Sequence, residues 1–340
     1  MAHSRAYVMK KGLFADFVEA LKEEGAVVAP KPVGEDLLYM SIEHASEVDF
    51  SRIPLDDPKM YLFPITERVL KFEDGKITPV LKSEKRVLLG VRPCDVAAFQ
   101  CLRHFFGDYV EEDKIRDPYV MDKMENLMIV AYNCPHPKEH CFCSAMGTGP
   151  VATSGFDLSL TDLGDAYLVE MGSEDGERIV QGLSLAPASP EEMERREEIR
   201  GRCEAEMKVD FSAEGIERKI EATVDAVAEK YGEKCIVCGG CNFYCPTCSC
   251  YNMSDIRRGA AVERVRFWDS CMLRGFTWLA GGTFERDTIG ARMKQRLMHK
   301  LSYTVEHYGM LSCTGCGRCS QVCPSYIYME DMIRDILRGG

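Results

Sequence analysis

A twelve-residue cysteine pattern occurs twice in this chain and constrains its fold more than any other feature. Residues 235–246 read CIVCGGCNFYCP and residues 313–324 read CTGCGRCSQVCP, so both follow C-x2-C-x2-C-x3-C-P. Three thiols at intervals of three residues can surround one face of an iron–sulfur cubane, and the intervening glycines let the backbone approach the sulfur atoms. The pattern therefore predicts two [4Fe–4S] sites in the last third of the chain.

The cysteine that precedes proline in each motif predicts crossed ligation. In two-cluster ferredoxins this fourth cysteine binds the cluster of the other motif. We therefore expect two ligand sets, of which the first is Cys235, Cys238, Cys241 and Cys323 and the second is Cys313, Cys316, Cys319 and Cys245.

Two other chemistries use related cysteine spacings. Structural zinc sites favour paired C-x2-C units, and a triplet followed by Cys-Pro departs from that pattern. Cys241, Cys245 and Cys248 also satisfy C-x3-C-x2-C, the radical S-adenosylmethionine pattern. That fold needs a long barrel after its motif, whereas fewer than a hundred residues follow here. Both alternatives therefore explain the sequence less well than a pair of [4Fe–4S] clusters.

Four further cysteines, Cys94, Cys134, Cys141 and Cys143, form a third candidate metal site. Four thiolates allow zinc or [4Fe–4S], and the neighbouring His136 and His140 are either extra ligands or surface residues. Cys94 and Cys134 each follow an apolar run with strand character, 87–90 and 127–132. Since ligands gather at the carboxyl ends of strands in open α/β sheets, a third cluster is expected there.

The other cysteines and the basic residues have less specific interpretations. Cys101 and Cys203 are expected to be small buried apolar residues. Cys248, Cys250 and Cys271 lie beside the motifs and either shape the cluster environment or replace an assumed ligand. The negative charge of thiolate-bound clusters calls for nearby cations. Candidates in the segment between the motifs are Arg257, Arg258, Arg264, Arg266 and Arg274, unless these are ordinary surface arginines.

Periodicity indicates an α+β chain with two domains. Short apolar runs alternate with helical stretches before residue 185, which predicts an α/β domain with a cluster site at 1–185. A charged, helix-forming linker is expected at 186–212. The segment 288–308 has helical spacing, so we expect an all-helical ferredoxin-like domain with two [4Fe–4S] clusters at 213–340.

Composition narrows the function. The net charge of −12 opposes a nucleic-acid partner, and no apolar run approaches the roughly 20 residues of a membrane span. The first residues lack the apolar stretch of a signal peptide, so a cytoplasmic protein is expected, where thiols stay reduced. With no G-x-G-x-x-G after a strand and no Walker loop, an electron-relay subunit without a catalytic centre is the leading hypothesis. The alternatives are a redox enzyme with substrate chemistry at the N-terminal cluster and a redox-sensing regulatory module.

Several rare motifs in the same order resemble one family. CIVCGGCNFYCPTCSC, FWDSCM with LAGG, CTGCGRCSQVCP, and the earlier RPCD with NC, CFC and MGTGP are similar to the dicluster electron-transfer subunit of anaerobic sulfite reductase and to the sulfhydrogenase beta subunit. The resemblance runs from about Leu88 to the C-terminus.

This resemblance implies an iron–sulfur electron-transfer subunit of an anaerobic multisubunit redox complex. Such subunits pass electrons between a flavin- and NAD(P)-binding partner of ferredoxin-reductase type and a catalytic subunit. That catalytic subunit is expected to be a hydrogenase, a sulfite reductase or a heterodisulfide-reductase-like protein. The resemblance also supports a cluster at Cys94, Cys134, Cys141 and Cys143.

Overall fold

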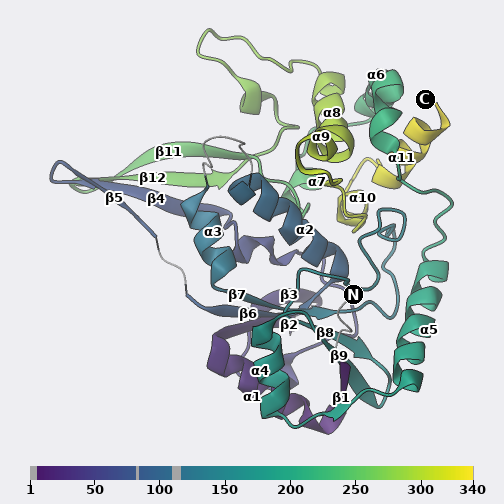
Figure 1. The fold of residues 1–340 in the computed structure, drawn as a ribbon. Helices are drawn as coiled ribbons and strands as arrows, with labels where there is room; N and C mark the ends of the chain where they lie inside the picture. Colours follow the sequence, from purple (N-terminus) through teal and green to yellow (C-terminus); the bar gives the residue numbers. More distant parts are fainter. Residues whose placement is uncertain (1–5, 82–83, 109–115, 340) are drawn as a thin grey trace.

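The computed structural model describes residues 6–81, 84–108 and 116–339, and an eight-stranded mixed sheet forms its base (Figure 1). The strand order is β10-β1-β9-β8-β7-β6-β2-β3, and β2, β6, β7 and β8 run parallel at its centre. The strands are β1 (Ala6–Lys10), β2 (Ala26–Val33), β3 (Asp36–Ser41), β6 (Arg86–Val91), β7 (Leu127–Tyr132), β8 (Leu158–Asp162), β9 (Ala166–Met171) and β10 (Ala186–Pro187). The α/β prediction for the N-terminal part is therefore confirmed.

Helices cover both faces of this sheet because its central strands are apolar on both sides. Val27 packs with α1 and α4 on one face, and the adjacent Val28 packs with α2 and α3 on the other. This arrangement is expected of buried parallel strands, whose sequences are continuously apolar. The helices are α1 (Phe14–Glu24, after the 3₁₀ turn η1, Lys11–Leu13), α2 (Pro93–Arg103, continued by the π turn η4, His104–Asp108), α3 (Pro118–Glu125) and α4 (Glu174–Gly182).

A second, four-stranded antiparallel sheet joins the N-terminal half of the chain to the segment between the two cysteine motifs. Its order is β11-β12-β4-β5, with β4 (Thr66–Glu73), β5 (Lys76–Pro79), β11 (Tyr251–Arg258) and β12 (Ala261–Trp268). Strand β12 pairs with β4 from Val262 opposite Phe72 to Phe267 opposite Thr66. Figure 1 shows this sheet projecting from the body of the molecule.

The prediction of an all-helical C-terminal domain is therefore wrong between the two cysteine motifs. The segment 261–268, AVERVRFW, alternates apolar and charged residues as a strand does. Its partner lies about 190 residues earlier in the sequence, and such distant pairing leaves no mark in a local helical period. The helical spacing of 288–308 was not representative of the whole segment.

The remaining C-terminal elements are helical. Buried side chains including Val224, Leu297 and Ile333 form one apolar core between α6, α8 and α11. Segment 288–308 is helical as predicted, although a π turn interrupts it. The elements are η5 (Ile216–Arg218), α6 (Ile220–Gly232), α7 (Gly240–Phe243), η6 (Arg274–Thr277), α8 (Ile289–Met298), η7 (His299–Tyr303), α9 (Thr304–Tyr308), α10 (Arg318–Gln321) and α11 (Met329–Arg338).

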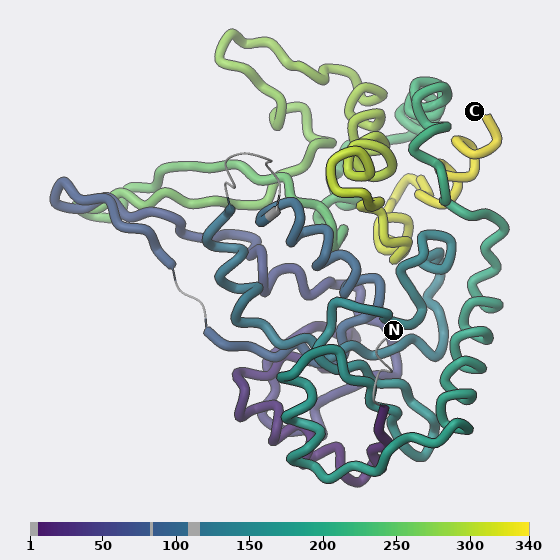
Figure 2. The backbone as a smooth tube through the Cα atoms, viewed as in Figure 1, coloured from purple at the N-terminus to yellow at the C-terminus, as the bar shows by residue number. Residues whose placement is uncertain are grey.

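A single long helix, α5 (Pro190–Glu206), runs along one side of the molecule between the large sheet and the C-terminal helices (Figure 2). Ser189 caps it, accepting from the Glu192 amide while Glu192 accepts from the Ser189 amide. The predicted helical character of this charged segment is confirmed, and Ile199 and Cys203 are its buried residues. In the described ranges, no helix has the length and apolarity required to span a bilayer.

Two short 3₁₀ turns, η2 (Ala45–Glu47) and η3 (Pro58–Tyr61), complete the fold. Asp57 caps η3 by accepting from the Lys59 amide at 2.8 Å. This cap fixes the start of a turn that places the Lys59 side chain inside the molecule, 1% exposed. The domain limits 185, 186–212 and 213 stay predictions.

Candidate metal centres

The first predicted ligand set lines one pocket. Cys235, Cys238 and Cys241 come from the first motif, where Gly239 adopts a left-handed conformation and α7 begins. Cys323 reaches the same pocket from the second motif. The backbone amides of Val237 and Ile327 each point at a sulfur of the set, at 3.4 Å from Cys235 Sγ and Cys323 Sγ. Such amide–sulfur contacts tune iron–sulfur sites.

The second predicted set lines the adjacent pocket. Cys313, Cys316 and Cys319 of the second motif meet Cys245 of the first motif there. Each fourth cysteine thus lies with the other motif's triplet, as crossed ligation requires. By contrast, Cys241 and Cys245 of the radical S-adenosylmethionine pattern line different pockets.

The two pockets adjoin. Arg296, Cys319 and Met329 line both of them, so a single layer of side chains separates the two sites. Cys238 is the exposed member of the first set, whereas Cys245 of the second is buried. The first site therefore lies nearer the surface and the second lies deeper.

The third predicted set is brought together at the carboxyl end of the parallel strands. Cys94 begins α2 just after β6, and Cys134 follows the neighbouring strand β7. Burial raises the pKa of Cys143 and of Cys94, and neighbouring thiols raise it further, Cys134 and Cys141 for Cys143 and Cys143 for Cys94, as expected of thiols that lie close together. The position of these cysteines at the strand ends agrees with the sequence analysis.

Cys203 of α5 was missed as a neighbour of this set. It is fully buried and interacts electrostatically with Cys134 and Cys141, and burial raises its pKa above the ordinary value. Its burial agrees with the sequence prediction. Its position beside the third site had no signal in the sequence, because α5 is a charged helix 60 residues away from Cys143 in the chain.

The loop that carries the third set packs directly on the second motif. The Phe142 amide donates to the Gly315 carbonyl at 2.8 Å, and Thr148 Oγ1 donates to the Thr314 carbonyl at 2.6 Å. Gly315 has a φ of +63°, and a Cβ there would lie 2.6 Å from the Cys143 nitrogen. Only glycine allows this approach. The three sites therefore form a row, with the second site in the middle.

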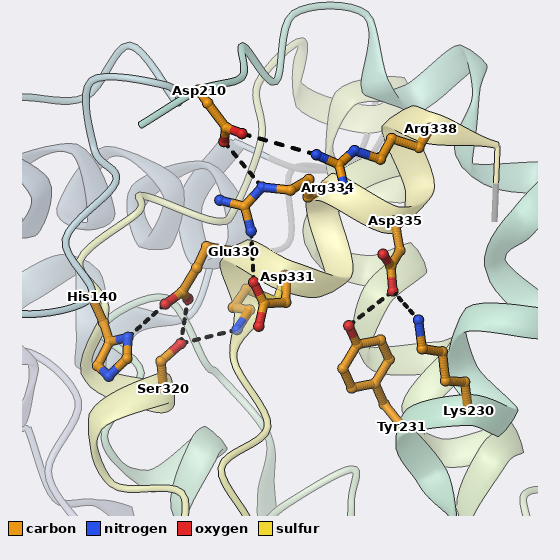
Figure 3. A network of polar contacts seen from close by, with 11 residues as sticks. His140, Asp210, Lys230, Tyr231, Ser320, Glu330, Asp331, Arg334, Asp335 and Arg338 are labelled. Carbon is orange, nitrogen blue, oxygen red and sulfur yellow. Dashed lines mark hydrogen bonds and ion pairs between the residues drawn. The ribbon is translucent and has the colours of Figure 1, made fainter. Parts of the chain in front are cut away.

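A polar network fixes the same loop to the C-terminal helix (Figure 3). His140 Nδ1 lies 2.6 Å from Glu330 Oε1 on α11, and Ser320 Oγ donates to Glu330 Oε2 at 2.6 Å. His136 pairs with Glu206 at 2.9 Å and its side chain is 65% exposed. Both histidines therefore face carboxylates, and the alternative of extra metal ligands gains no support from their positions.

Figure 3 also shows how α11 is held against its neighbours. Arg334 pairs with Asp210 at 3.0 Å, and Asp335 accepts from both Lys230 Nζ at 2.7 Å and the Tyr231 hydroxyl at 2.9 Å. These contacts join α11 to α6 and to the segment after α5. These contacts hold α11 in place, and Met329 and Met332 of α11 line the first pocket.

The cysteines outside the predicted ligand sets divide into two kinds. Cys101 is buried and donates to the Leu311 carbonyl at 3.5 Å, and burial raises its pKa to about 12, as expected of a small buried thiol. The neighbouring Cys245 raises the pKa of Cys248, and the neighbouring Cys271 raises that of Cys250, so each of these thiols lies beside another cysteine. Whether Cys248, Cys250 and Cys271 shape the cluster environment or replace an assumed ligand therefore stays a prediction with both alternatives.

The arginines proposed from the sequence as counter-charges face other groups. Arg257, Arg258 and Arg274 are exposed, and Arg264 pairs with Asp255. Arg266 is buried but pairs with Glu67 and Asp117, which joins β12 to the N-terminal half. The sequence could not single out Arg266 as the buried one, because its partners come from distant segments.

The cations that do face the cysteines are Arg296, Lys300, Lys59, Arg318 and Arg92, all at most 3% exposed. Lys59 Nζ donates to the Cys245 carbonyl at 2.8 Å and the Cys248 carbonyl at 3.1 Å. Arg318 forms a two-point ion pair with Asp95 at 2.5 and 2.8 Å, which ties the second motif to α2. Arg92 Nη2 donates to the Arg52 carbonyl at 2.7 Å.

The residues present fit iron–sulfur clusters. Burial raises the pKa of Cys241 to about 12 and that of Cys141 to about 11, so both hold their proton at neutral pH and a bound cluster would have to displace it. Thr314 Oγ1, which borders the second pocket, is buried without a hydrogen-bond partner in the described ranges. Across residues 6–81, 84–108 and 116–339, no three Cys, His, Asp or Glu side chains gather as they would around a single ion.

Two adjoining pockets, each bordered by four thiols from crossed C-x2-C-x2-C-x3-C-P motifs, define an iron–sulfur electron-transfer protein of the dicluster type. A family model described as a 4Fe-4S dicluster domain matches residues 234–327. Sulfhydrogenase 2 subunit beta of Pyrococcus furiosus is 31% identical over 333 residues, which cover 96% of each chain. The chain belongs to the sulfhydrogenase beta subunit family, as the motif resemblance indicated.

Proposed function

We propose that this chain relays electrons between a flavin- and NAD(P)-binding subunit and a catalytic redox subunit, through three [4Fe–4S] clusters. The observation that carries the proposal is the row of three cysteine sets, in which the second adjoins both the first and the third. A [4Fe–4S] cluster takes up and releases single electrons, with a potential set by charge, hydrogen bonds and exposure. A row that begins near the surface at Cys238 and continues inward is the arrangement that a relay needs.

The proposed ligands are those of the sequence analysis. Cys235, Cys238, Cys241 and Cys323 hold the first cluster, and Cys313, Cys316, Cys319 and Cys245 hold the second. Cys94, Cys134, Cys141 and Cys143 hold the third. The similarity to a sulfhydrogenase subunit favours a hydrogenase as the catalytic partner over a sulfite reductase or a heterodisulfide-reductase-like protein.

Iron content and spectroscopy test the number of clusters. The full chain, reconstituted under anaerobic conditions, should hold about twelve irons and give the spectra of magnetically interacting reduced clusters. Cys94→Ser should lower the iron content by one cluster, and Cys101→Ser is the matched control, because Cys101 is also buried but lies outside the ligand sets. A wild-type chain with clearly fewer than eight irons would contradict the proposal.

Crossed ligation has its own test in electron paramagnetic resonance. Cys245→Ser and Cys316→Ser should alter the same spectral component, whereas Cys323→Ser and Cys238→Ser should alter the other. Uncrossed ligation predicts the opposite grouping, with Cys245→Ser and Cys238→Ser changing one component together.

A second candidate function is substrate chemistry at the N-terminal cluster. A cleft of about 670 Å³ opens beside the third site, and Arg92, Pro135, Lys138 and Asp56 line it. This volume lies within the range of small-molecule pockets. Turnover of any substrate by the isolated chain with a chemical electron donor, lost in Cys134→Ser, would favour this enzyme. Electron transfer that requires both partner subunits would favour the relay.

A further inference from the structure

Two buried cations, Arg296 and Lys300, follow each other by one turn on the helix formed by α8 and η7. Arg296 is 3% exposed and Lys300 is 2% exposed. Arg296 Nε donates to Asn242 Oδ1 at 3.2 Å and Arg296 Nη1 contacts Met329 Sδ at 3.3 Å. Lys300 Nζ donates to Thr247 Oγ1 at 2.6 Å. In the part of the chain that the structure describes, neither cation forms an ion pair with a carboxylate.

A buried charge without a counter-charge carries a large desolvation cost. The groups that face these two cations are an amide oxygen, a hydroxyl, a thioether and the cysteines. Arg296 lines the first pocket with Cys241 and both pockets with Cys319, and its charge attracts the thiolate form of both cysteines. Lys300 interacts with Cys245, Cys248 and Cys313. The cysteines, as thiolate ligands of the proposed clusters, are therefore the available source of negative charge.

The two cations differ in the pockets that they border. Arg296 borders both the first and the second pocket, whereas Lys300 borders the second pocket alone. Arg292, one turn earlier on α8, is 4% exposed but borders neither pocket. It donates instead to the carbonyls of Arg286 at 2.9 Å and Asp287 at 2.7 Å.

We infer that Arg296 sets the reduction potentials of the first and second clusters together and that Lys300 sets the potential of the second alone. This inference rests on the proposed function, since it assigns charges to clusters that the cysteine sets would hold. Reduction adds an electron to each site, and a fixed positive charge beside the site favours the reduced state. Both residues raise the reduction potential of a cluster through their positive charge. Arg296 affects both clusters because it borders both pockets.

Redox titration of the full, cluster-loaded chain, followed by electron paramagnetic resonance, tests this inference. The second-cluster signal is first identified by its loss in Cys245→Ser. Arg296→Gln should then lower both midpoint potentials by at least 59 mV. This shift corresponds to a tenfold change in the reduction equilibrium of a one-electron couple. Lys300→Met should lower the second potential by a similar factor and leave the first within error. Arg296→Lys, which keeps the charge, should leave both midpoint potentials close to the wild-type values. Arg292→Gln is the matched control and should shift neither potential.

The outcomes separate this inference from the proposed function. A wild-type chain with fewer than eight irons would overturn both. Full iron content with unshifted potentials in Arg296→Gln, or equal shifts in Arg296→Gln and Arg292→Gln, would overturn the inference alone. If Arg296→Gln does not retain its clusters, Lys300→Met decides, because any shift of the first potential, or no shift of the second, overturns the inference.

Discussion

Replacing Asp95 by Asn should destabilise the protein strongly, because it leaves the Arg318 guanidinium buried without its counter-charge. The side chains of the pair are 2% and 0% exposed, and both carboxylate oxygens accept from the guanidinium. Removal of one partner of a buried ion pair costs about 3–5 kcal/mol. We expect about 3 kcal/mol, at the lower end, because Cys316 also interacts with Arg318. Such a loss increases the population of opened molecules roughly a hundredfold.

The pair between Arg264 and Asp255 provides a matched control. It has the same two-point geometry, at 2.8 Å for both contacts, but its side chains are 40% and 46% exposed. Exposed pairs contribute about 0.2–1 kcal/mol, so Asp255→Asn should have a small effect.

Native-state proteolysis of the cluster-loaded chain measures the difference. When opening and closing are fast relative to cleavage, the rate of cleavage follows the equilibrium population of the open form. Asp95→Asn should be cleaved roughly a hundred times faster than wild type, and Asp255→Asn less than about fivefold faster. Equal cleavage rates for the two variants would refute the assignment of a structural role to the buried pair.

Three further predictions concern the surroundings of the sites. Gly315→Ala should weaken the third and second sites together, because its Cβ would lie 2.6 Å from the Cys143 nitrogen at a φ of +63°; unchanged iron content and melting temperature would contradict this. Lys59→Met removes two hydrogen bonds to carbonyls of the cysteine loop, each worth about 1.5–3 kcal/mol, so a chelator should extract iron faster from the second cluster. Burial raises the pKa of Asp56 to about 6, so the native state binds a proton more tightly than the unfolded state, and stability falls as pH rises from about 4 to 6. Asp56→Asn should therefore raise the melting temperature relative to wild type at pH 8 and much less at pH 4, and an equal gain at both values would count against the assigned pKa.

Local sequence patterns carried the prediction of the sites. The spacing of the cysteines alone indicated which thiols meet, and the structure places Cys323 with the first triplet and Cys245 with the second. The strands before Cys94 and Cys134 could also be recognised, because continuous apolar runs identify buried parallel strands.

Long-range contacts account for what the sequence did not reveal. Strand β12 depends on pairing with β4, and Arg266 depends on Glu67 and Asp117, so neither could be read from neighbouring residues. Arg296 and Lys300 resembled ordinary basic residues of an amphipathic helix. Their role becomes visible only when the helix is placed against both motifs.

The pairing of β4 with β12 also has a consequence for synthesis of the chain on the ribosome. Strand β4 is made about 190 residues before its partner, which at 5–20 residues per second leaves one edge uncovered for roughly 10–40 s. An open strand edge invites association with other chains. Slow translation or a premature stop before residue 261 should therefore yield aggregates in place of a free N-terminal half.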